Sequence, residues 1–313
     1  MLPLVSVVTV TYNSARYVKD TIESVLAQDY SNIEYIIGDD CSTDDTWNII
    51  QGYHDPRIRN YRNDKNLREY PNRNKAIGLA TGKYLIFIDG DDIIFPHGVS
   101  FFVTMMEAFP DAGMAIQKNY QNNLLFPALL SPEDTLKNHF YGKVDLLSSS
   151  FTSDFFRTDL LKKWKLSERY IVGDEEIRLK LAFHHPVLFV AGWVSWPRET
   201  PNQASSRIDN AQRMAEIYQF STELLSKAGA LGFDADLTND MQAHINMHLS
   251  RLALHYLRKG KAAAARQLLS GTGFTWQKVY KFYAYRKQFD DVLASYTTSN
   301  PYRNGFLNKV SNS

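Results

Sequence analysis

The stretch that decides the fold is residues 83–92, KYLIFIDGDD. Its apolar run, 84–88, is typical of a strand that is buried on both faces in the centre of an α/β sheet. The run ends in three carboxylates, Asp89, Asp91 and Asp92. Ligands of such sheets bind beyond the carboxyl ends of the strands, so we predict a binding site at the end of this strand.

The three carboxylates are themselves a candidate cation site. In extended backbone Asp89 and Asp91 point to the same side, and Gly90 lets the chain turn or approach a ligand closely. Carboxylates at this spacing suit Mg²⁺ or Mn²⁺ shared with a phosphate. The alternative is a solvated acidic turn, or the cap of a helix that begins at Ile93.

Strands and helices alternate on both sides of this stretch, which indicates right-handed βαβ units and a mainly parallel sheet. The sequence predicts strands at 4–10, 33–37, 58–61, 84–88 and 187–196. It predicts helices at 18–26, 46–53, 71–80, 96–108, 159–164 and 174–183. Residues 112–150 are poorly patterned, and there we expect irregular structure and short strands.

Composition narrows the class of protein. The chain has 313 residues, of which 44% are hydrophobic and 22% charged, as in ordinary soluble globular proteins. Its net charge of +1 gives no overall sign of nucleic-acid binding. The single cysteine, Cys41, excludes an internal disulfide. No apolar run approaches the roughly 20 residues of a membrane-spanning helix, and the N-terminus does not resemble a signal peptide, so we expect a cytoplasmic protein.

The last third of the chain has a different character. Apolar residues recur at helical spacing from Ile208 onward, so we predict two domains, 1–205 and 206–313. Residues 251–313 hold 11 Lys/Arg and 2 Asp/Glu, a local balance of +9. The basic, aromatic stretch from Trp276 onward has two interpretations: a contact with an anionic membrane surface or acidic partner, or an ordinary helix with a solvated basic face. The helices also offer a surface for a homodimer.

Four motifs, in order, resemble the family 2 glycosyltransferases, inverting enzymes with the GT-A fold that use nucleotide-activated sugars. Residues 5–13, VSVVTVTYN, resemble the opening strand and turn, and 36–46, IIGDDCSTDDT, resemble the next motif. Residues 66–76 resemble a segment with an arginine in the position of Arg73, and 82–92 resemble one that ends in SDD. The resemblance covers about 1–205. It implies a GT-A-type nucleotide-binding fold with a mixed, mainly parallel sheet, followed by an α-helical C-terminal region.

The resemblance also implies which residues bind the donor and a metal ion. It assigns nucleotide-sugar binding to Thr11, Tyr12, Asn13, Asp39, Asp40, Arg73, Asp89 and Gly90. Asp39 would accept the N3–H of a uracil ring, Arg73 would meet the base or the pyrophosphate, and Asp89 would bind the ribose. Asp91 would hold Mn²⁺ or Mg²⁺ between pyrophosphate oxygens. Turn and cap chemistry is the alternative for Asp39 and Asp40, and a surface position is the alternative for Arg73.

Inverting transfer is a single displacement, which needs a base for the proton of the acceptor hydroxyl. The family uses a carboxylate in an ED-like segment that opens a helix. Aligning residues 177–182, IRLKLA, with the family's LWLRLA puts Asp174 in that position, with Glu175 as second candidate. The alternative is a pair of acids that complement the helix dipole. Thr200 stands where many members place a histidine metal ligand, which leaves the third protein ligand open.

The resemblance implies a metal-assisted glycosyltransferase that moves a sugar from a UDP-sugar to a hydroxyl of a surface glycan or its lipid-linked precursor. Basic C-terminal residues fit a lipid-pyrophosphate acceptor at the inner face of a membrane. A sugar-nucleotide nucleotidyltransferase is the alternative, although no Gly-rich phosphate loop follows the first strand. A non-catalytic nucleotide-sugar-binding protein is a third hypothesis. The absence of G-x-G-x-x-G after that strand excludes a Rossmann dehydrogenase.

Overall fold

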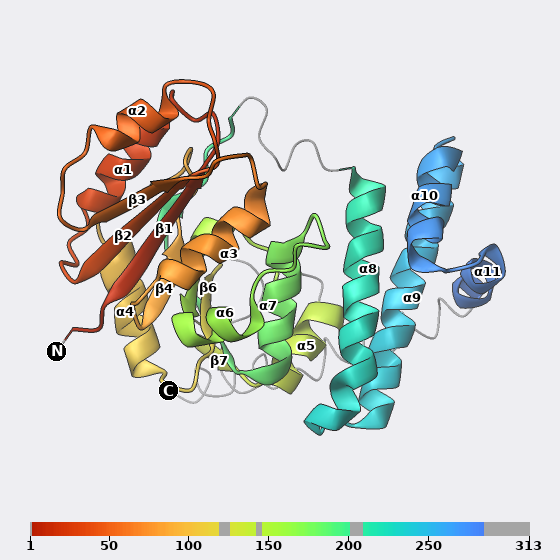
Figure 1. The fold of residues 1–313 in the computed structure, drawn as a ribbon. Helices are drawn as coiled ribbons and strands as arrows, with labels where there is room; N and C mark the ends of the chain where they lie inside the picture. Colours follow the sequence, from red (N-terminus) through yellow and green to blue (C-terminus); the bar gives the residue numbers. More distant parts are fainter. Residues whose placement is uncertain (1, 119–125, 142–145, 201–208, 285–313) are drawn as a thin grey trace.

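The computed structural model describes residues 2–118, 126–141, 146–200 and 209–284, and Figure 1 shows their arrangement. An eight-stranded sheet has the order β3-β2-β1-β4-β8-β6-β9-β7. Its strands are β1 (Val5–Thr11), β2 (Ile33–Asp39), β3 (Ile58–Arg62), β4 (Tyr84–Phe87), β6 (Met114–Gln117), β7 (Ala128–Leu130), β8 (Asp154–Arg157) and β9 (Val187–Val190). Strands β3, β2, β1 and β4 pair in parallel, whereas β8 is antiparallel to both its neighbours. The predicted mixed, mainly parallel sheet is confirmed.

Strand β4 is buried on both faces, as its sequence predicts. Leu85 and Phe87 lie in one core cluster, and Tyr84 and Ile86 lie in the other. All four side chains are at most 2% exposed. Burying an apolar side chain of this size contributes about 1.5–3 kcal/mol relative to leaving it exposed, so the run fixes β4 at the sheet centre.

The carboxyl ends of the parallel strands meet at one edge of the sheet. The register pairs Thr11 with Asp39, at the ends of β1 and β2, and Val8 with Phe87, near the end of β4. The helices of this half are α1 (Val18–Leu26), α2 (Thr46–Gln51), α3 (Glu69–Leu79) and α4 (Gly98–Ala108). The chain between β4 and α4 therefore starts at the edge where we expect a ligand.

At residues 89–92 the structure shows the acidic turn that was one alternative, whereas the extended backbone and the other alternative, a helix from Ile93, are wrong. Residues 89–92 form a turn, with the Asp92 N–H 2.9 Å from the Asp89 carbonyl oxygen, so Asp89 and Asp91 are not in extended backbone. No helix begins at Ile93 either, because β5 (Ile93–Ile94) pairs with β10 (Ser195–Trp196). The predicted strand 187–196 is thus two strands, β9 and β10, separated at Gly192, whose φ of 146° disrupts regular strand geometry.

The region 112–150 is more regular than predicted. Besides β6 and β7 it contains a helix, α5 (Pro132–Tyr141). Proline opens this helix, and the Ser131 hydroxyl accepts the N–H of Asp134 at 3.1 Å. Both are helix-start signals that the sequence carries. The next helices, α6 (Thr158–Trp164) and α7 (Gly173–His184), lie where the sequence predicts them.

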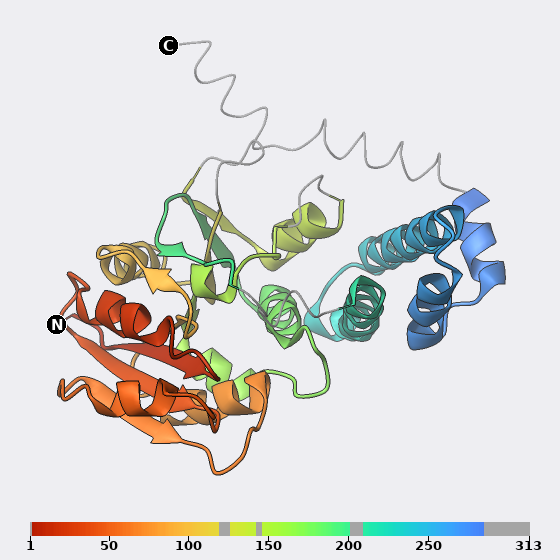
Figure 2. The same ribbon diagram turned by 90° about the horizontal axis from the view of Figure 1, so that it is seen from above.

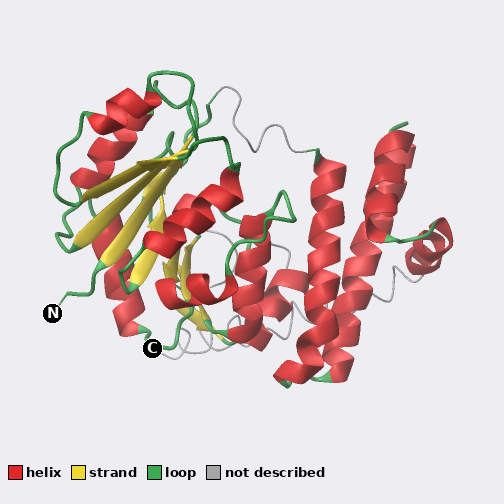
Figure 3. Ribbon diagram, viewed as in Figure 1, coloured by secondary structure: helices red, strands yellow, loops and turns green. Residues whose placement is uncertain are grey.

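The C-terminal region is helical, as predicted (Figure 3). Its helices are α8 (Asn210–Lys227), α9 (Ala235–Arg258), α10 (Ala262–Thr272) and α11 (Trp276–Ala284). In Figures 1 and 2 they stand beyond α7 and α5, on the side away from β1–β3. Phe220 and Met241 belong to the core cluster that contains Leu85 and Phe87 of β4. Ala253 and Leu268 belong to a separate cluster formed by the C-terminal helices. The predicted boundary near 205 lies outside the described residues, and the homodimer stays a prediction.

None of the helices in the described ranges combines the length and the apolar character that crossing a bilayer requires.

Candidate active site

Arg73 holds Asp89 at the end of β4. Its Nη2 lies 2.7 Å from Asp89 Oδ1 and 3.0 Å from Glu69 Oε1. The guanidinium carbon is 5.0 Å from the ring centres of both Phe87 and Phe151. Arg73 is 2% exposed, so the alternative of a surface arginine is wrong. Burial lowers the pKa of Arg73, but the two carboxylates outweigh it and raise that pKa, so the site keeps a fixed positive charge.

The carboxylates of the turn lie close enough for their charges to repel one another. Burial raises the pKa of Asp89 to about 6; Arg73 opposes this, while the charges of Glu69 and Asp91 add to it. Burial and the charge of Asp89 raise the pKa of Asp92 to about 8, although the Arg198 N–H donates to its carboxylate at 3.0 Å. Like charges in a partly dehydrated turn disfavour ionisation. A cation bound at this turn would relieve that repulsion.

The residues around Asp91 fit a hard divalent cation. Thr200, in the place that the resemblance gives to histidine, donates from Oγ1 to Asp91 Oδ2 at 2.7 Å. Within the described ranges, no three His, Cys, Asp or Glu side chains converge as a metal site. Magnesium often binds through one or two carboxylates and takes its other ligands from phosphate and water. The oxygen donors of Asp91 and Thr200 match that mode of binding.

The end of β1 presents an unused hydroxyl beside Gly90. Thr11 Oγ1 is buried and has no hydrogen-bond partner among the described residues. A Cβ at Gly90 would lie 2.5 Å from this oxygen, so only glycine fits the close approach of the two strands' ends. Tyr12, next along the chain, is 48% exposed. Asn13 instead joins two loops, because its Oδ1 accepts the Thr43 N–H at 2.8 Å.

Asp39 and Asp40 organise the loops after β2. Asp39 is fully buried, and it accepts the Ser42 N–H at 3.1 Å and pairs with Arg62 Nε at 3.3 Å. Asp40 accepts the N–H groups of Leu67 and Arg68 at 2.8 and 2.9 Å. In this structure both carboxylates thus do the turn and cap chemistry that was their alternative role. A base contact by Asp39 stays a prediction, and it requires Asp39 to exchange one of these partners.

Asp174 is held at both of its oxygens at the start of α7. Its Oδ1 lies 3.1 Å from the Tyr70 hydroxyl, and its Oδ2 lies 3.0 Å from Arg178 Nη2. Burial raises the pKa of Asp174, but the charge of Arg178 and the hydrogen bonds from Tyr70 and Arg178 outweigh it and lower that pKa. The side chain is 27% exposed. Asp174 is therefore an ionised, oriented carboxylate that a ligand can reach.

The residues on either side of Asp174 have other partners. Gly173 stands where the family pattern has an acid, and a Cβ there would lie 2.9 Å from the Ser167 carbonyl oxygen. Glu175 pairs with Arg213 of α8. Burial raises the pKa of Glu175 in spite of that arginine. Asp174 thus faces α3, whereas Glu175 ties α7 to the C-terminal helices.

The structure brings the acidic turn and Asp174 together around Phe151. The ring centre lies 5.0 Å from the guanidinium carbon of Arg73 and 5.5 Å from that of Arg178. One arginine binds Asp89 and the other binds Asp174. The site therefore spans the end of β4 and the start of α7.

Sequence reasoning missed four residues of this site: Tyr70, Phe151, Arg178, and Asp154, whose Oδ2 lies 2.6 Å from Arg178 Nε. The spacing of Asp174 and Arg178, four residues apart in a predicted helix, could have indicated their contact. Tyr70 had no such signal, because it precedes Asp174 by 104 positions.

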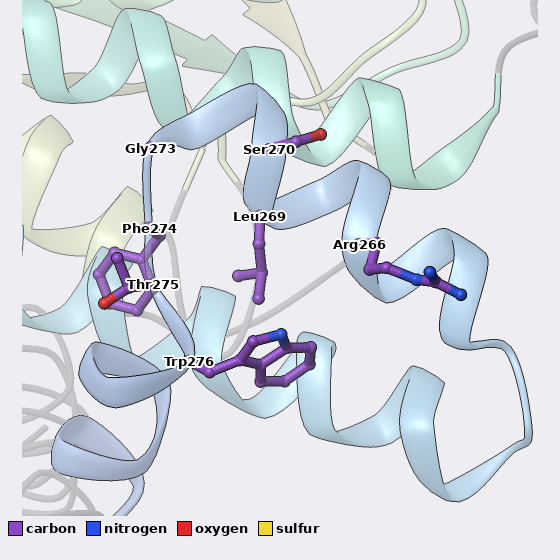
Figure 4. Close-up of a pocket in the computed structure, with 7 residues that line it drawn as sticks. All are labelled: Arg266, Leu269, Ser270, Gly273, Phe274, Thr275 and Trp276. Carbon is purple, nitrogen blue, oxygen red and sulfur yellow. The ribbon is translucent and has the colours of Figure 1, made fainter.

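A cavity of about 410 Å³ lies elsewhere, between α10 and α11. Figure 4 shows Leu269 and Trp276 facing each other across it, whereas Arg266 and Ser270 point away. Its seven lining residues among the described part of the chain lie between Arg266 and Trp276, and none of them belongs to the site described above.

Comparison with known proteins shows the family to which the chain belongs. The model of the family "Glycosyl transferase family 2" matches residues 6–164, so the chain belongs to that family. The expected family and class of enzyme are confirmed. Family membership also counts against the nucleotidyltransferase alternative.

Solved structures support the same fold. S. aureus TarS 1–349, solved in complex with UDP-GlcNAc, superposes with a TM-score of 0.69 at 21% identity, covering 96% of this chain and 92% of that chain. The mannosyltransferase PcManGT from Pyrobaculum calidifontis, in complex with GDP-Man and Mn²⁺, gives a TM-score of 0.58 at 16% identity, covering 96% of this chain and 88% of that chain. At these identities the likeness shows the fold alone.

Two relatives are more similar in sequence. The Escherichia coli enzyme WfaP, named UDP-Glc:alpha-D-GlcNAc-diphosphoundecaprenol beta-1,3-glucosyltransferase, is 41% identical over 106 residues, which are 34% of this chain and 42% of that protein. The Campylobacter jejuni GalNAc(5)-diNAcBac-PP-undecaprenol beta-1,3-glucosyltransferase is 28% identical over 197 residues, 58% of this chain and 60% of that protein. The chain thus aligns with less than two thirds of either relative.

Proposed function

We propose that this protein is an inverting glycosyltransferase that moves a sugar from a UDP-sugar to a hydroxyl of a lipid-linked or polymeric surface glycan. The observation that carries the proposal is the arrangement around Phe151. It combines an acidic turn suited to a metal–diphosphate with an ionised, accessible carboxylate suited to a base. Family membership and the printed substrates of the relatives support it.

The nucleotide would bind at the carboxyl ends of β1, β2 and β4. Thr11 offers a buried hydroxyl without a partner among the described residues, and Tyr12 offers an exposed ring for the base. Gly90 leaves room for close approach to the acidic turn. A UDP-sugar is the favoured donor because the relative WfaP is named for UDP-Glc.

Asp91 and the Thr200 hydroxyl would hold a Mg²⁺ or Mn²⁺ ion. The ion would supply positive charge to the diphosphate that departs from the sugar. Asp89, kept in place by Arg73, would remain for the ribose hydroxyls. Arg73 adds a second, permanent positive charge beside the turn.

Asp174 would act as the base in a single displacement. The acceptor oxygen forms a bond to the anomeric carbon while the bond from that carbon to the diphosphate oxygen breaks, and the hydroxyl proton passes to Asp174. Tyr70 and Arg178 fix the direction of the carboxylate before the acceptor arrives. Attack of the acceptor from the face opposite the leaving group would give inversion.

The decisive measurement is calorimetry of UDP, GDP, dTDP and ADP binding, each with and without Mn²⁺. We expect UDP to bind most tightly and to require Mn²⁺, because the acidic turn repels a diphosphate that lacks a cation. Tight UDP binding without metal would remove the metal from the proposal. Failure of all four nucleotides to bind would reject the donor site.

The basic C-terminal face would meet an anionic membrane that carries the lipid-linked acceptor. Residues 251–284 contain seven Lys/Arg and no Asp/Glu. Exposed members include Lys278 and Lys281 on α11, with Tyr280 59% exposed between them. Basic and aromatic residues on one helix suit the surface of an anionic bilayer.

Sedimentation with vesicles checks this contact. We expect binding to vesicles of phosphatidylglycerol and not of phosphatidylcholine, weakened by salt and by Lys278→Gln with Lys281→Gln, since each basic residue contributes about 1 kcal/mol near such a surface. Replacing exposed Lys19 and Lys65 of the other half serves as control. Equal binding to both lipids would contradict the proposal.

A further inference from the structure

Arg178 is buried in the site, and its hydrogen bonds go to two carboxylates and one backbone carbonyl. The side chain is 0% exposed. Its Nε lies 2.6 Å from Asp154 Oδ2, and its Nη2 lies 3.0 Å from Asp174 Oδ2 and 2.9 Å from the Ser149 carbonyl oxygen. One guanidinium thus joins a carboxylate of the sheet to the carboxylate at the start of α7. A rigid planar fork of this kind suits two partners at fixed directions.

Asp154 anchors Arg178 to the sheet. It begins β8, which pairs with β4 and β6 in the centre of the sheet, and it is 0% exposed. Its other oxygen accepts the Ser149 hydroxyl at 2.7 Å. The position of Arg178 is therefore set by the sheet, so the arginine can transmit a fixed position to Asp174.

Two side chains hold the carboxylate of Asp174, and Arg178 is the charged one of the two. The charge of Arg178 is the largest influence that favours the ionised form of Asp174, followed by the Tyr70 hydrogen bond, while burial opposes both. Among the described residues, Tyr70 and Arg73 on α3 and Glu175 and Arg178 on α7 act directly on Asp174. Asp154 on β8 acts on Arg178, and Arg213 on α8 acts on Glu175. Without Arg178, burial and the neighbouring acids would act against the carboxylate.

We propose that Arg178, anchored by Asp154, is the positioning residue of this site: it keeps Asp174 ionised and fixed in direction for proton transfer. The proposal rests on the proposed role of Asp174 as base. Arg178 itself touches neither donor nor acceptor in this scheme. Arg178 acts on the reaction only through the carboxylate of Asp174.

A double variant, Arg178→Lys and one control variant separate the positioning role of Arg178 from its contribution to folding. Arg178→Met alone leaves Asp154 buried and unpaired, which endangers the fold. The double variant Asp154→Asn with Arg178→Met removes that buried charge and still deprives Asp174 of its partner. Arg178→Lys restores a positive charge without the planar fork. Lys180→Met is the matched control, because Lys180 forms the equivalent ion pair four residues apart on α7, with Glu176 at 2.6 Å.

The first readout is independent of turnover. Carbon-13 NMR of aspartate-labelled protein, with Asp174→Asn to assign the resonance, follows the titration of Asp174. In the double variant we expect the pKa of Asp174 to rise by about 1–3 pH units, since loss of an adjacent opposite charge has effects of that size. We expect a smaller rise in Arg178→Lys and none in Lys180→Met. An unchanged titration in the double variant overturns the proposal.

The second readout is the pH profile of UDP release from the UDP-sugar that the wild type turns over. A base works only when ionised, so a raised pKa shifts the acidic limb of kcat to higher pH. We expect that shift in the double variant, together with a kcat about 10–100-fold lower at pH 7, partial recovery in Arg178→Lys and no change in Lys180→Met. A lower kcat without a shifted limb would show a merely structural role. If the wild type releases no UDP from any donor, the proposed function fails, and the titration still decides the position of Arg178.

Discussion

Replacing Asp174 by asparagine is expected to lower turnover about 10²–10⁴-fold, the usual contribution of a general base. Asparagine keeps the size of the side chain and can still accept from Tyr70, but it cannot take a proton from an acceptor hydroxyl. UDP binding should stay within about twofold of wild type, because we place the nucleotide at the strand ends rather than on α7. Initial rates of UDP release with acceptor present, beside calorimetry of UDP, measure the two effects.

Glu175→Gln is the matched control for that substitution. Glu175 neighbours Asp174 on the same turn of α7, yet its carboxylate pairs with Arg213 on α8. Its loss should therefore lower stability more than turnover. If Glu175→Gln abolished turnover while Asp174→Asn retained it, the base would be Glu175, the second candidate that the sequence offers.

Replacing Asp91 by asparagine is expected to remove the dependence of UDP binding on Mn²⁺. A neutral amide binds a divalent cation more weakly than a carboxylate because it lacks the negative charge, so the variant should bind UDP equally with and without the ion. In the presence of Mn²⁺ we expect affinity at least about 100-fold below wild type, more than the loss of an outer-shell partner of a metal site. Calorimetry at fixed ionic strength measures both quantities.

Asp111→Asn controls for the loss of one negative charge. Asp111 is exposed and follows α4, away from the strand ends, so its loss should leave both the affinity and the metal dependence unchanged. Retention of full Mn²⁺ dependence by Asp91→Asn would move the ion to another carboxylate of the turn. Thr200→Ala is expected to have a smaller effect than Asp91→Asn, because a hydroxyl is the weaker of the two oxygen donors.

The parallel half of the fold was predictable because local pattern and burial agree there. Alternate residues of β4 serve two core clusters, and a continuous apolar run is the sequence signature of that arrangement. The acidic end of the strand was predictable because the carboxylates follow the apolar run directly in the sequence. The turn at 89–92 was the alternative that the sequence offered, with a local hydrogen bond from Asp92 to Asp89. The pairing of Ile93 with Trp196 was not predictable, because it depends on a strand a hundred residues later.

The sequence predicted the candidate binding and catalytic residues of the site, but not the residues that orient them. Asp91, Asp174 and Arg73 could be found from motifs, whereas the partners that orient them come from other elements. Asp154 reaches Arg178 from a sheet strand, and Tyr70 reaches Asp174 from α3. Such contacts follow from packing and have no periodicity along the chain. For Asp39 and Asp40, motif matching suggested ligand binding, which stays a prediction, whereas the structure shows that they hold two loops in place.

The contacts between α7 and α8 limit how this enzyme can be recombined with its relatives. Glu175 pairs with Arg213, and the backbone N–H of Ile171 donates to Glu216 at 2.6 Å, so α8 supports the helix that carries Asp174. A chimera joined near residue 205 would replace both α8 partners at once. A junction after Lys227 keeps them, and it therefore allows the remaining C-terminal helices to be exchanged without removing the support of α7.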